Sequence, residues 1–312
     1  MRHQELIEKM TLEEKAAFLT GKNEWCSRGY KHLGIESITF ADGPSGVRRQ
    51  YGNGDHLGLN PSTPATCFPS SSTLANSWDE ALEEKVGSAL GQEAALEDVA
   101  VLLAPGLNLK RNPLCGRNFE YYSEDPLLSG KIAAAAVRGI QSRGVSACIK
   151  HFACNNQEFA RTVNDSRVSE RALRQIYLKG FEICIKEAKP QNIMTSYNKI
   201  NGVYSYFNYD LCTSVLRGEW GYAGNVMTDW WTKKGKSPDF GTLRNQAYRV
   251  RAQVDVLMPG GSRAGRRKPD GTLLESLGKD GGITLGELQR SAANVLRFAM
   301  NSSAFDKNTT AD

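Results

Sequence analysis

Short apolar runs alternate along the chain with longer segments in which apolar residues recur at helical spacing. This alternation is typical of parallel strands joined by helical crossovers. Seven of the runs are predicted to be strands, and the position of an eighth is ambiguous. The predicted strands are Ser37–Ala41, Thr66–Phe68, Val99–Ala104, Ser146–Ile149, Asn192–Ser196, Asn225–Thr228 and Val254–Met258.

The helical segments each have one apolar face. Behind Ser169, whose hydroxyl can cap a helix, Leu173, Ile176 and Phe181 recur at helical spacing up to Glu187. The number of strand–helix units favours an α/β fold with a (β/α)8 TIM-like barrel, with a doubly wound open sheet as the alternative. We expect a single barrel domain over residues 1–300 and a polar C-terminal tail over residues 301–312. Further helices are predicted over Asp79–Glu97, Leu128–Arg143, Asp210–Trp220 and Leu285–Met300.

Composition and charge narrow the class of protein. The 39 basic and 34 acidic residues are mixed along the chain without a basic face, so no nucleic acid partner is expected. The seven cysteines lack the spacing of a disulfide framework and are expected to be reduced thiols in the core. No run approaches the roughly 18 apolar residues of a membrane span, and MRHQELIEKM lacks the apolar region of a secretion signal. We therefore expect a cytoplasmic protein without a membrane partner.

Nucleotide, metal and serine-hydrolase chemistry lack their sequence signatures. Neither GxxxxGKS nor GxxxxGKT occurs, and no GxGxxG follows a strand. His151 and Cys154 have no further ligand pair at metal-site spacing, and Gly43-Pro44-Ser45-Gly46 lacks the GxSxG pattern. No cofactor and no metal are expected.

Polar, charged and aromatic residues follow the apolar strands repeatedly. In a parallel barrel such positions line one mouth, where the chemistry is found. Carboxylates with Arg and Lys can hold the hydroxyls of a sugar, and tryptophan can stack on its C–H face. The pattern favours a carbohydrate site in which Asp229 can attack an anomeric carbon. The residues after the strands are Asp42 with Arg48, then Arg117, Lys150 with His151, Tyr197, and Asp229 with Trp230 and Trp231.

Five ordered motifs carry a resemblance to a known family. They are DGPSGVR (42–48), NLKRNPLCGRNFEYYSEDP (108–126), KHFACNNQE (150–158), MTSYNKING (194–202) and VMTDWW (226–231). Together they resemble glycoside hydrolase family 3, and its β-glucosidase branch in particular. The resemblance runs from TLEEKAAFLTG near the start to the helix ELQRSAANVLR, so it covers nearly the whole chain.

The resemblance implies a catalytic barrel that hydrolyses terminal non-reducing β-glucosides with retention. It implies that Asp229 is the nucleophile and that a β-linked glucoside or oligosaccharide is the substrate. The residues that would line the sugar subsite by this resemblance are Asp42, Arg48, Arg117, Lys150, His151, Met194, Tyr197 and Trp230. By contrast, Glu120, Glu124, Asp125 and Glu158 are interpreted as ion pairs and loop anchors, with Glu158 expected to pair with Arg161.

A second carboxyl group, which retaining hydrolysis needs, is not identified in this sequence. In the β-glucosidase branch an α/β sandwich domain supplies the acid/base glutamate, so we expect that residue to come from an absent second domain or chain. One alternative is a sugar-binding barrel that is not catalytic, and another is a scaffold that binds only protein. A third is a single-domain β-N-acetylglucosaminidase, which is disfavoured because Arg167 stands where that branch has its histidine and cannot donate a proton.

Overall fold

The computed structural model of the chain divides into two compact units, and parallel strands followed by helices occur in both. The central unit is Thr39–Gly202, and the terminal unit combines Met1–Ile38 with Val203–Asp312. The α/β fold class predicted from the sequence is confirmed by the strand and helix order. The residues that the structure describes are 2–51, 54–55, 59–232, 235–237, 240–259 and 271–302.

The central unit contains four parallel strands in the order β1, β2, β3 and β5. The register pairs Phe40 with Val101 between β1 and β2, and Cys148 with Asn192 between β3 and β5. All seven residues of β3 are buried, as expected of a parallel strand that is covered on both faces. The bounds of these strands are Phe40–Asp42 for β1, Val101–Leu103 for β2, Ser146–Phe152 for β3 and Asn192–Thr195 for β5.

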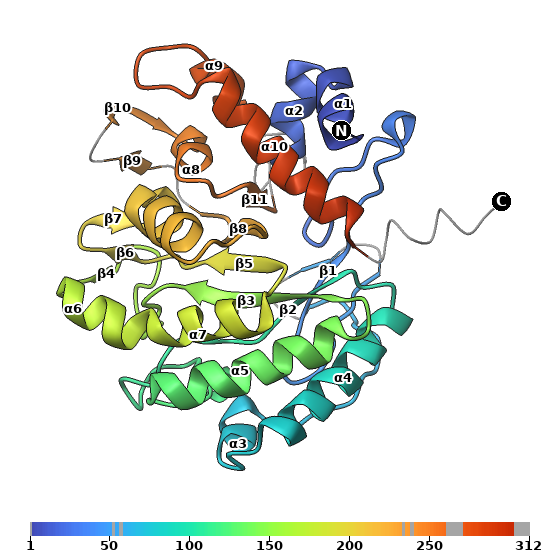
Figure 1. Cartoon of the computed structure of the whole chain (residues 1–312), viewed down its shortest axis with the longest axis vertical. Coiled ribbons are helices and arrows are strands. Elements are labelled where there is room, and N and C mark those ends of the chain that lie inside the picture. Colours follow the sequence, from blue (N-terminus) through green and yellow to red (C-terminus); the bar gives the residue numbers. More distant parts are fainter. Residues whose placement is uncertain are drawn as a thin grey trace. The chain divides into compact units, whose positions relative to one another are not determined.

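Three long helices of the central unit pack against one another in sequence order, α4 on α5 and α5 on α7 (Figure 1). Helix α4 spans Glu80–Leu96, α5 spans Pro126–Gln141 and α7 spans Lys179–Ala188. Asp79 caps α4, and Asp125 caps α5 immediately before its N-terminal proline, so both helices begin where the sequence places a capping residue. The remaining elements are α3 (Ser71–Ala75), η2 (Asn118–Glu120), β4 (Asp165–Ser166), α6 (Glu170–Ala172), the π-helical η3 (Leu173–Tyr177) and β6 (Lys199–Ile200).

The terminal unit contains the parallel pair β8 (Asn225–Trp230) and β11 (Val256–Met258). Helix α10 (Leu285–Met300) packs on α1 (Arg2–Lys9) and α2 (Leu12–Phe18). The other elements are η1 (Lys31–Leu33), β7 (Val203–Tyr204), η4 (Ser205–Phe207), the π-helical η5 (Asp210–Glu219), the antiparallel pair β9 (Gly235–Ser237) and β10 (Phe240–Asn245), α8 (Ala247–Arg251) and α9 (Thr272–Ser276).

A buried ion pair holds β8 and its surroundings in register. Asp255 is fully buried, and its Oδ2 accepts from Arg217 Nη2 at 2.6 Å and from the Val226 amide at 3.1 Å. Its Oδ1 accepts from Asn294 of α10 at 3.1 Å. Burial raises the pKa of Asp255, and the charge of Arg217 opposes that rise. One carboxylate therefore ties η5, β8 and α10 together within this unit.

Helix α10 is amphipathic. It begins with a reciprocal capping box between Thr284 and Glu287, and it buries Leu288, Val295 and Leu296. Its charged residues, Glu287, Arg290 and Arg297, are half-buried or exposed, as expected of a helix that covers a core on one face only. In the ranges that the structure describes, no helix combines the length and the apolar character that a membrane crossing requires.

The predicted helices are confirmed, including the Ser169 cap, whose hydroxyl accepts from the Ala172 amide. Six of the predicted strands are confirmed with small differences at their ends, but the strand predicted over Thr66–Phe68 is wrong. Pro64 and Pro69 bracket that run and cannot donate ladder hydrogen bonds, and β1 pairs directly with β2 instead.

All seven cysteines are free thiols, as predicted. Five of them are buried, whereas Cys26 is half-buried and Cys67 is exposed, so the expectation that they all lie in the core is wrong for these two. Cys67 lies within the proline-bracketed segment that forms no strand, which explains its exposure. The single barrel domain over residues 1–300 stays a prediction, and most of the predicted tail, residues 303–312, lies outside the described residues.

Candidate functional site

Four charged side chains of alternating sign meet in the central unit. Lys150 Nζ donates to Asp42 Oδ1 at 2.9 Å and lies 3.5 Å from Glu120 Oε2. The other oxygen of Glu120 accepts from Arg117 Nε. Lys150 and Glu120 are each only 2% exposed, whereas the Asp42 side chain is 39% exposed. The cluster is therefore buried at its centre and open to solvent at Asp42.

The strand ends of the sheet position this charged cluster. Asp42 is the last residue of β1, and Lys150 lies near the end of β3 with Met194 of β5 as its register partner. Gly106, just after β2, bridges to Lys150 on one side and to Tyr121 on the other. A Cβ atom at Gly106 would lie 2.7 Å from the Glu120 carbonyl oxygen, so only glycine lets these segments come this close.

The electrostatics of the cluster favour the charged forms of Asp42 and Lys150. Burial by itself would raise the pKa of Asp42, but Lys150, Arg117 and the Gly43 amide outweigh it and lower this pKa to about 2. Burial likewise opposes the charge on Lys150, yet Asp42 and Glu120 raise its pKa. At neutral pH the cluster presents an ionised carboxylate beside a fixed ammonium, a combination that can accept from and donate to neighbouring hydroxyls.

His151 follows Lys150, and its main-chain amide, its carbonyl and one ring nitrogen each contact a neighbouring side chain. Its main-chain amide donates to Asn108 Oδ1 at 2.8 Å, and Asn108 Nδ2 donates back to the His151 carbonyl at 2.9 Å. Its Nδ1 lies 3.1 Å from the Tyr121 hydroxyl. Burial, then the charges of Arg117, Lys150 and Arg161, hold the pKa of His151 well below its usual range. The imidazole is therefore neutral in the folded protein.

The loop after β1 is a tight turn that fixes Asp42 and Arg48. The Arg48 amide donates to the Asp42 carbonyl at 2.8 Å, and the Gly43 amide donates to Asp42 Oδ1 at 3.1 Å. Gly43 has φ of 130°, and a Cβ atom there would lie 1.6 Å from the Gly46 carbonyl oxygen. Arg48 Nη2 donates to the Asp55 carbonyl at 3.0 Å, which orients its guanidinium.

Met194 and Tyr197 complete the predicted residues of the central unit. Met194 is buried in β5, and Tyr197, 8% exposed, follows that strand. The Arg161 guanidinium lies over the Tyr197 ring, 4.8 Å from its centroid, and Arg161 pairs with Glu158 at 2.8 Å. The expected Glu158–Arg161 ion pair is confirmed.

In the terminal unit, Asp229 and Trp230 are the last two residues of β8. Asp229 is 8% exposed, and its Oδ1 accepts from the Trp230 amide at 2.7 Å. The Trp230 indole donates to the Glu24 carbonyl at 2.9 Å, and its ring packs against Trp25 with centroids 5.6 Å apart. The Trp231 side chain is more exposed, and its amide donates to the Met258 carbonyl at 3.0 Å. The carboxylate of Asp229 thus sits on a rigid strand end that indole packing supports.

Several residues of this region escaped prediction from the sequence. Tyr121, Asn108 and Asn155 are buried polar residues that hold His151 or its partners. Glu120 forms ion pairs, as expected, but its partners are two of the predicted sugar ligands, Lys150 and Arg117. These residues lie within the motifs over 108–126 and 150–158, but their presence in a motif does not by itself say where a side chain points. In the ranges that the structure describes, no three His, Cys, Asp or Glu side chains gather as they would around a metal ion.

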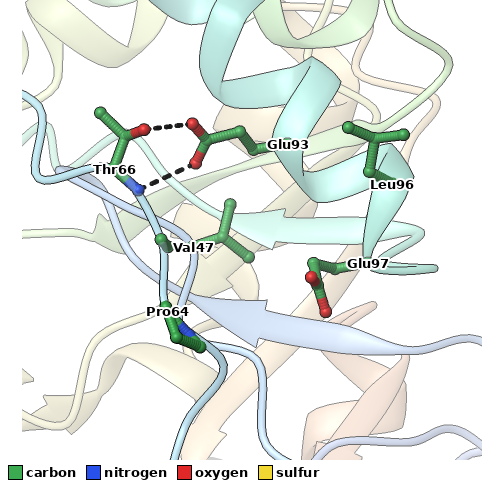
Figure 2. A pocket seen from close by; sticks show the side chains of 7 residues that line it. Val47, Pro64, Thr66, Glu93, Leu96 and Glu97 are labelled. Atoms are coloured by element: carbon green, nitrogen blue, oxygen red, sulfur yellow. Dashed lines mark hydrogen bonds between the residues drawn. The ribbon is translucent and has the colours of Figure 1, made fainter.

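A separate cavity of about 370 Å³ lies beside the β1 loop in the central unit. Figure 2 shows Glu93 of α4 reaching Thr66, whose amide donates to Glu93 Oε2 at 3.2 Å, with Val47 and Pro64 on the same wall. The Thr66 hydroxyl also donates to Glu93 Oε1. This contact ties the 63–68 segment to α4, and the Phe68 amide in turn donates to the Ser45 carbonyl of the β1 loop at 2.9 Å. The cavity is thus lined by part of the 63–68 segment, which holds the loop that carries Asp42 and Arg48.

Most of the chain matches the model of one protein family. Residues 57–298 match the model described as glycosyl hydrolase family 3 N terminal domain. Among curated proteins, thermostable β-glucosidase B of Acetivibrio thermocellus is 44% identical over 292 residues, which is 94% of this chain and 37% of that protein. An exo-α-(1→6)-L-arabinopyranosidase of Bifidobacterium longum is also 44% identical, over 93% of this chain and 36% of that protein. The chain therefore spans little more than a third of the length of these relatives.

Solved structures give the same picture. Two structures of β-glucosidase 3B from Thermotoga neapolitana, in complex with glycerol and with glucose, each match with a TM-score of 0.87 and 39% identity. Each match covers 98% of this chain and 44% of that chain. The predicted fold class, α/β of the TIM-like barrel type, is confirmed by this match.

Proposed function

The chain belongs to glycosyl hydrolase family 3, and on that premise we propose that it takes part in hydrolysing terminal non-reducing β-glucosides with retention at the anomeric carbon. The observation that carries the proposal is the charged cluster at the strand ends of the central unit. There Lys150, 2% exposed, donates to a partly open Asp42 whose pKa is lowered to about 2. An ionised acceptor beside a fixed donor suits two adjacent hydroxyls of a sugar.

In the proposed reaction Asp229 is the nucleophile. A carboxylate oxygen of Asp229 forms a bond to C1 of the sugar while the bond from C1 to the leaving oxygen breaks, and that oxygen keeps the electron pair and takes up a proton. Water then attacks C1, gives up a proton and releases Asp229. The position of Asp229 at the end of β8, where Asp255 and the Trp25–Trp230 packing restrain the strand, supports this role.

The proposed sugar subsite comprises eight residues. Asp42 accepts from hydroxyls, Lys150 and Arg117 donate to them, and neutral His151 can donate or accept one hydrogen bond. Trp230 offers an aromatic face to the C–H side of the ring. The subsite residues are Asp42, Arg48, Arg117, Lys150, His151, Met194, Tyr197 and Trp230.

We further propose that the acid/base glutamate comes from outside these 312 residues, from an α/β sandwich domain or a second chain. Retaining hydrolysis requires two carboxyl groups about 5 Å apart, one of which protonates the leaving oxygen and later activates water. The observation that the chain matches only 37% of the first relative's length is consistent with this division of roles. The single-domain alternative is disfavoured because Arg167, 74% exposed, pairs with Asp165 at 2.7 Å and cannot act as an acid.

One relative supports a second candidate substrate. The arabinopyranosidase is as identical to this chain as the β-glucosidase is, at 44%. An α-L-arabinopyranoside lacks the hydroxymethyl group of a glucoside and differs from it at one ring hydroxyl. A panel of nitrophenyl glycosides, assayed with this chain and the proposed acid/base domain together, would separate the two. Preference for the β-glucoside would support the main proposal, and preference for the α-L-arabinopyranoside would replace it.

The nucleophile can be tested without the acid/base residue. Dinitrophenyl 2-deoxy-2-fluoro-β-glucoside carries a leaving group that needs no proton, so Asp229 alone should displace dinitrophenolate and retain the fluorosugar. Intact-protein and peptide mass spectrometry should find the sugar on Asp229. Asp229→Ala should abolish the adduct, whereas Asp210→Ala, which removes an exposed carboxylate of the same unit, should not. Sugar binding without any adduct would favour a non-catalytic barrel, and absence of glucose binding would favour the protein scaffold.

A further inference from the structure

Arg161 occupies a position that the sequence motifs do not explain. Its guanidinium lies over the Tyr197 ring at 4.8 Å from the centroid, within the range of a cation–π contact. Its side chain is 38% exposed, so burial alone does not hold it there. Glu158, three residues earlier, accepts from Arg161 Nη1 at 2.8 Å and anchors the guanidinium from the other side.

Glu158 also connects Arg161 to His151. Its second carboxylate oxygen accepts from Asn155 Nδ2 at 3.1 Å, and the same amide donates to the Tyr121 hydroxyl at 3.0 Å. That hydroxyl lies 3.1 Å from His151 Nδ1. A continuous series of contacts therefore runs from the Tyr197 ring through Arg161, Glu158, Asn155 and Tyr121 to His151.

We infer that Arg161 is a positioning residue for the sugar subsite, one that orients the Tyr197 ring and, through Glu158, restrains the side of the subsite that carries His151. The inference rests on the proposed function, since it concerns two residues assigned to that subsite. Arg161 acts through Tyr197 and His151 and is not itself assigned a contact with the sugar.

A guanidinium suits this role better than an ammonium does. Its planar face can stack on a ring while its edge donates to a carboxylate, whereas lysine presents a point charge that cannot do both in one geometry. The positive charge matters as well. Burial is the main cause of the low pKa of His151, and Arg117, Lys150 and Arg161 each add to it, so Arg161 helps to keep the imidazole neutral.

The chain offers a matched control six residues further on, just after β4. Arg167 pairs with Asp165 at 2.7 Å but is 74% exposed, and it stacks on no aromatic ring among the residues that the structure describes. Arg161→Met and Arg167→Met each delete a guanidinium and one acidic partner's ion pair. Only the first also removes the contact with Tyr197, so effects that come merely from loss of a surface charge should be equal in both.

Two readouts on the 312-residue chain test the inference. Calorimetry with glucose should show about a fivefold loss of affinity in Arg161→Met, the equivalent of about 1 kcal/mol of cation–π energy, and no comparable loss in Arg167→Met. In ¹⁵N-histidine NMR, the pKa of His151, which is one of four histidines, should rise in Arg161→Met and stay unchanged in Arg167→Met. Arg161→Lys should retain most of the His151 titration but should not restore glucose affinity, because it keeps the charge and loses the planar stack.

The outcomes separate this inference from the function on which it rests. If the unmodified chain does not bind glucose at millimolar concentration, the proposed function fails, while the His151 titration and the ¹³C signals of the Tyr197 ring still test the role of Arg161. If glucose binds but Arg161→Met and Arg167→Met behave alike in affinity, in the His151 titration and in the Tyr197 ring signals, Arg161 is only a surface residue and the inference is overturned.

Discussion

Glu83 of α4 is a buried carboxyl group that should make the stability of the protein depend on pH. It is 3% exposed, and its Oε1 accepts from the Tyr122 hydroxyl at 2.8 Å. Its Oε2 is also buried and has no hydrogen-bond partner among the residues that the structure describes. Burial raises the pKa of Glu83 from 4.5 to about 7, and the Tyr122 hydrogen bond opposes the rise only in part.

The size of the effect follows from the two pKa values. In the unfolded chain Glu83 ionises near pH 4.5, whereas in the folded protein it keeps its proton up to about pH 7. Between these values the unfolded state loses a proton that the folded state retains, so the folded state becomes less stable as the pH rises. A pKa difference of this size corresponds to about 3 kcal/mol of unfolding free energy, which is fully lost above pH 7 and fully present below pH 4.5.

Glu83→Gln should remove this dependence, because glutamine is neutral at every pH and can still accept from Tyr122. Urea unfolding, followed by the fluorescence of the five tryptophans, would give the unfolding free energy of both proteins from pH 4.5 to pH 8. The unfolding free energy of the variant minus that of the wild type should increase by about 3 kcal/mol from pH 4.5 to pH 8. Other titrating groups cancel because both proteins carry them.

Glu84→Gln provides the control. Glu84 lies next to Glu83 on α4, but its side chain is 47% exposed and pairs with Arg138 at 2.8 Å. An exposed pair of this kind contributes no more than about 1 kcal/mol to the unfolding free energy. If the Glu83→Gln difference stayed flat across the range, Glu83 would be ionised in the folded protein at its ordinary pKa and the reasoning from burial would be refuted.

Three further substitutions test how the site is supported. Lys150→Met should cost about 3–5 kcal/mol in urea unfolding and abolish glucose binding in calorimetry, because it leaves buried Glu120 without its ammonium. Arg217→Met should lower the unfolding free energy by a similar amount, about 3–5 kcal/mol, because it leaves the buried carboxylate of Asp255 without its ion-pair partner. Adding Asp255→Asn should recover part of this loss, and no recovery would count against the ion pair. Gly43→Ala should cost about 1–3 kcal/mol and weaken glucose binding, since φ is 130° and the new Cβ would lie 1.6 Å from a carbonyl oxygen; unchanged affinity would contradict the proposed role of this turn.

Much of the fold was predictable because burial and helix capping restrict which residue types occur at neighbouring positions of the sequence. The strands β3 and β8 each contain a short apolar run and are buried at every residue, as expected of parallel strands covered on both faces. The caps Asp79, Asp125 and Ser169 mark where helices begin. The exception, Thr66–Phe68, has the composition of a strand, but the Thr66 amide donates to the Glu93 side chain and the Phe68 amide to the Ser45 carbonyl, so the run joins no sheet. Composition and length alone cannot distinguish such a run from a true strand.

The candidate site was predictable in its residue types and only partly in its contacts. Asp42, Lys150 and Arg117 follow the predicted strands in motifs that point to sugar chemistry, and the structure of the central unit brings them together. Glu120, interpreted from the sequence as part of an ion pair or a loop anchor, forms ion pairs with both Lys150 and Arg117, and the sequence did not identify these two partners. Tyr121 was missed because a tyrosine next to a glutamate looks the same whether its hydroxyl is buried or exposed.

By itself the sequence determined the α/β class, the positions of most strands and helices, and the membership of a family whose motifs survive in order along the chain. These properties depend on neighbours a few residues apart, through apolar periodicity, capping and short motifs. Only the tertiary structure decided which charges touch, for example that Lys150 reaches back 108 positions to Asp42, and that Arg161 covers Tyr197. Ionisation and orientation depend on burial and on distances of a few ångströms between segments remote in the chain, and no local pattern encodes those distances.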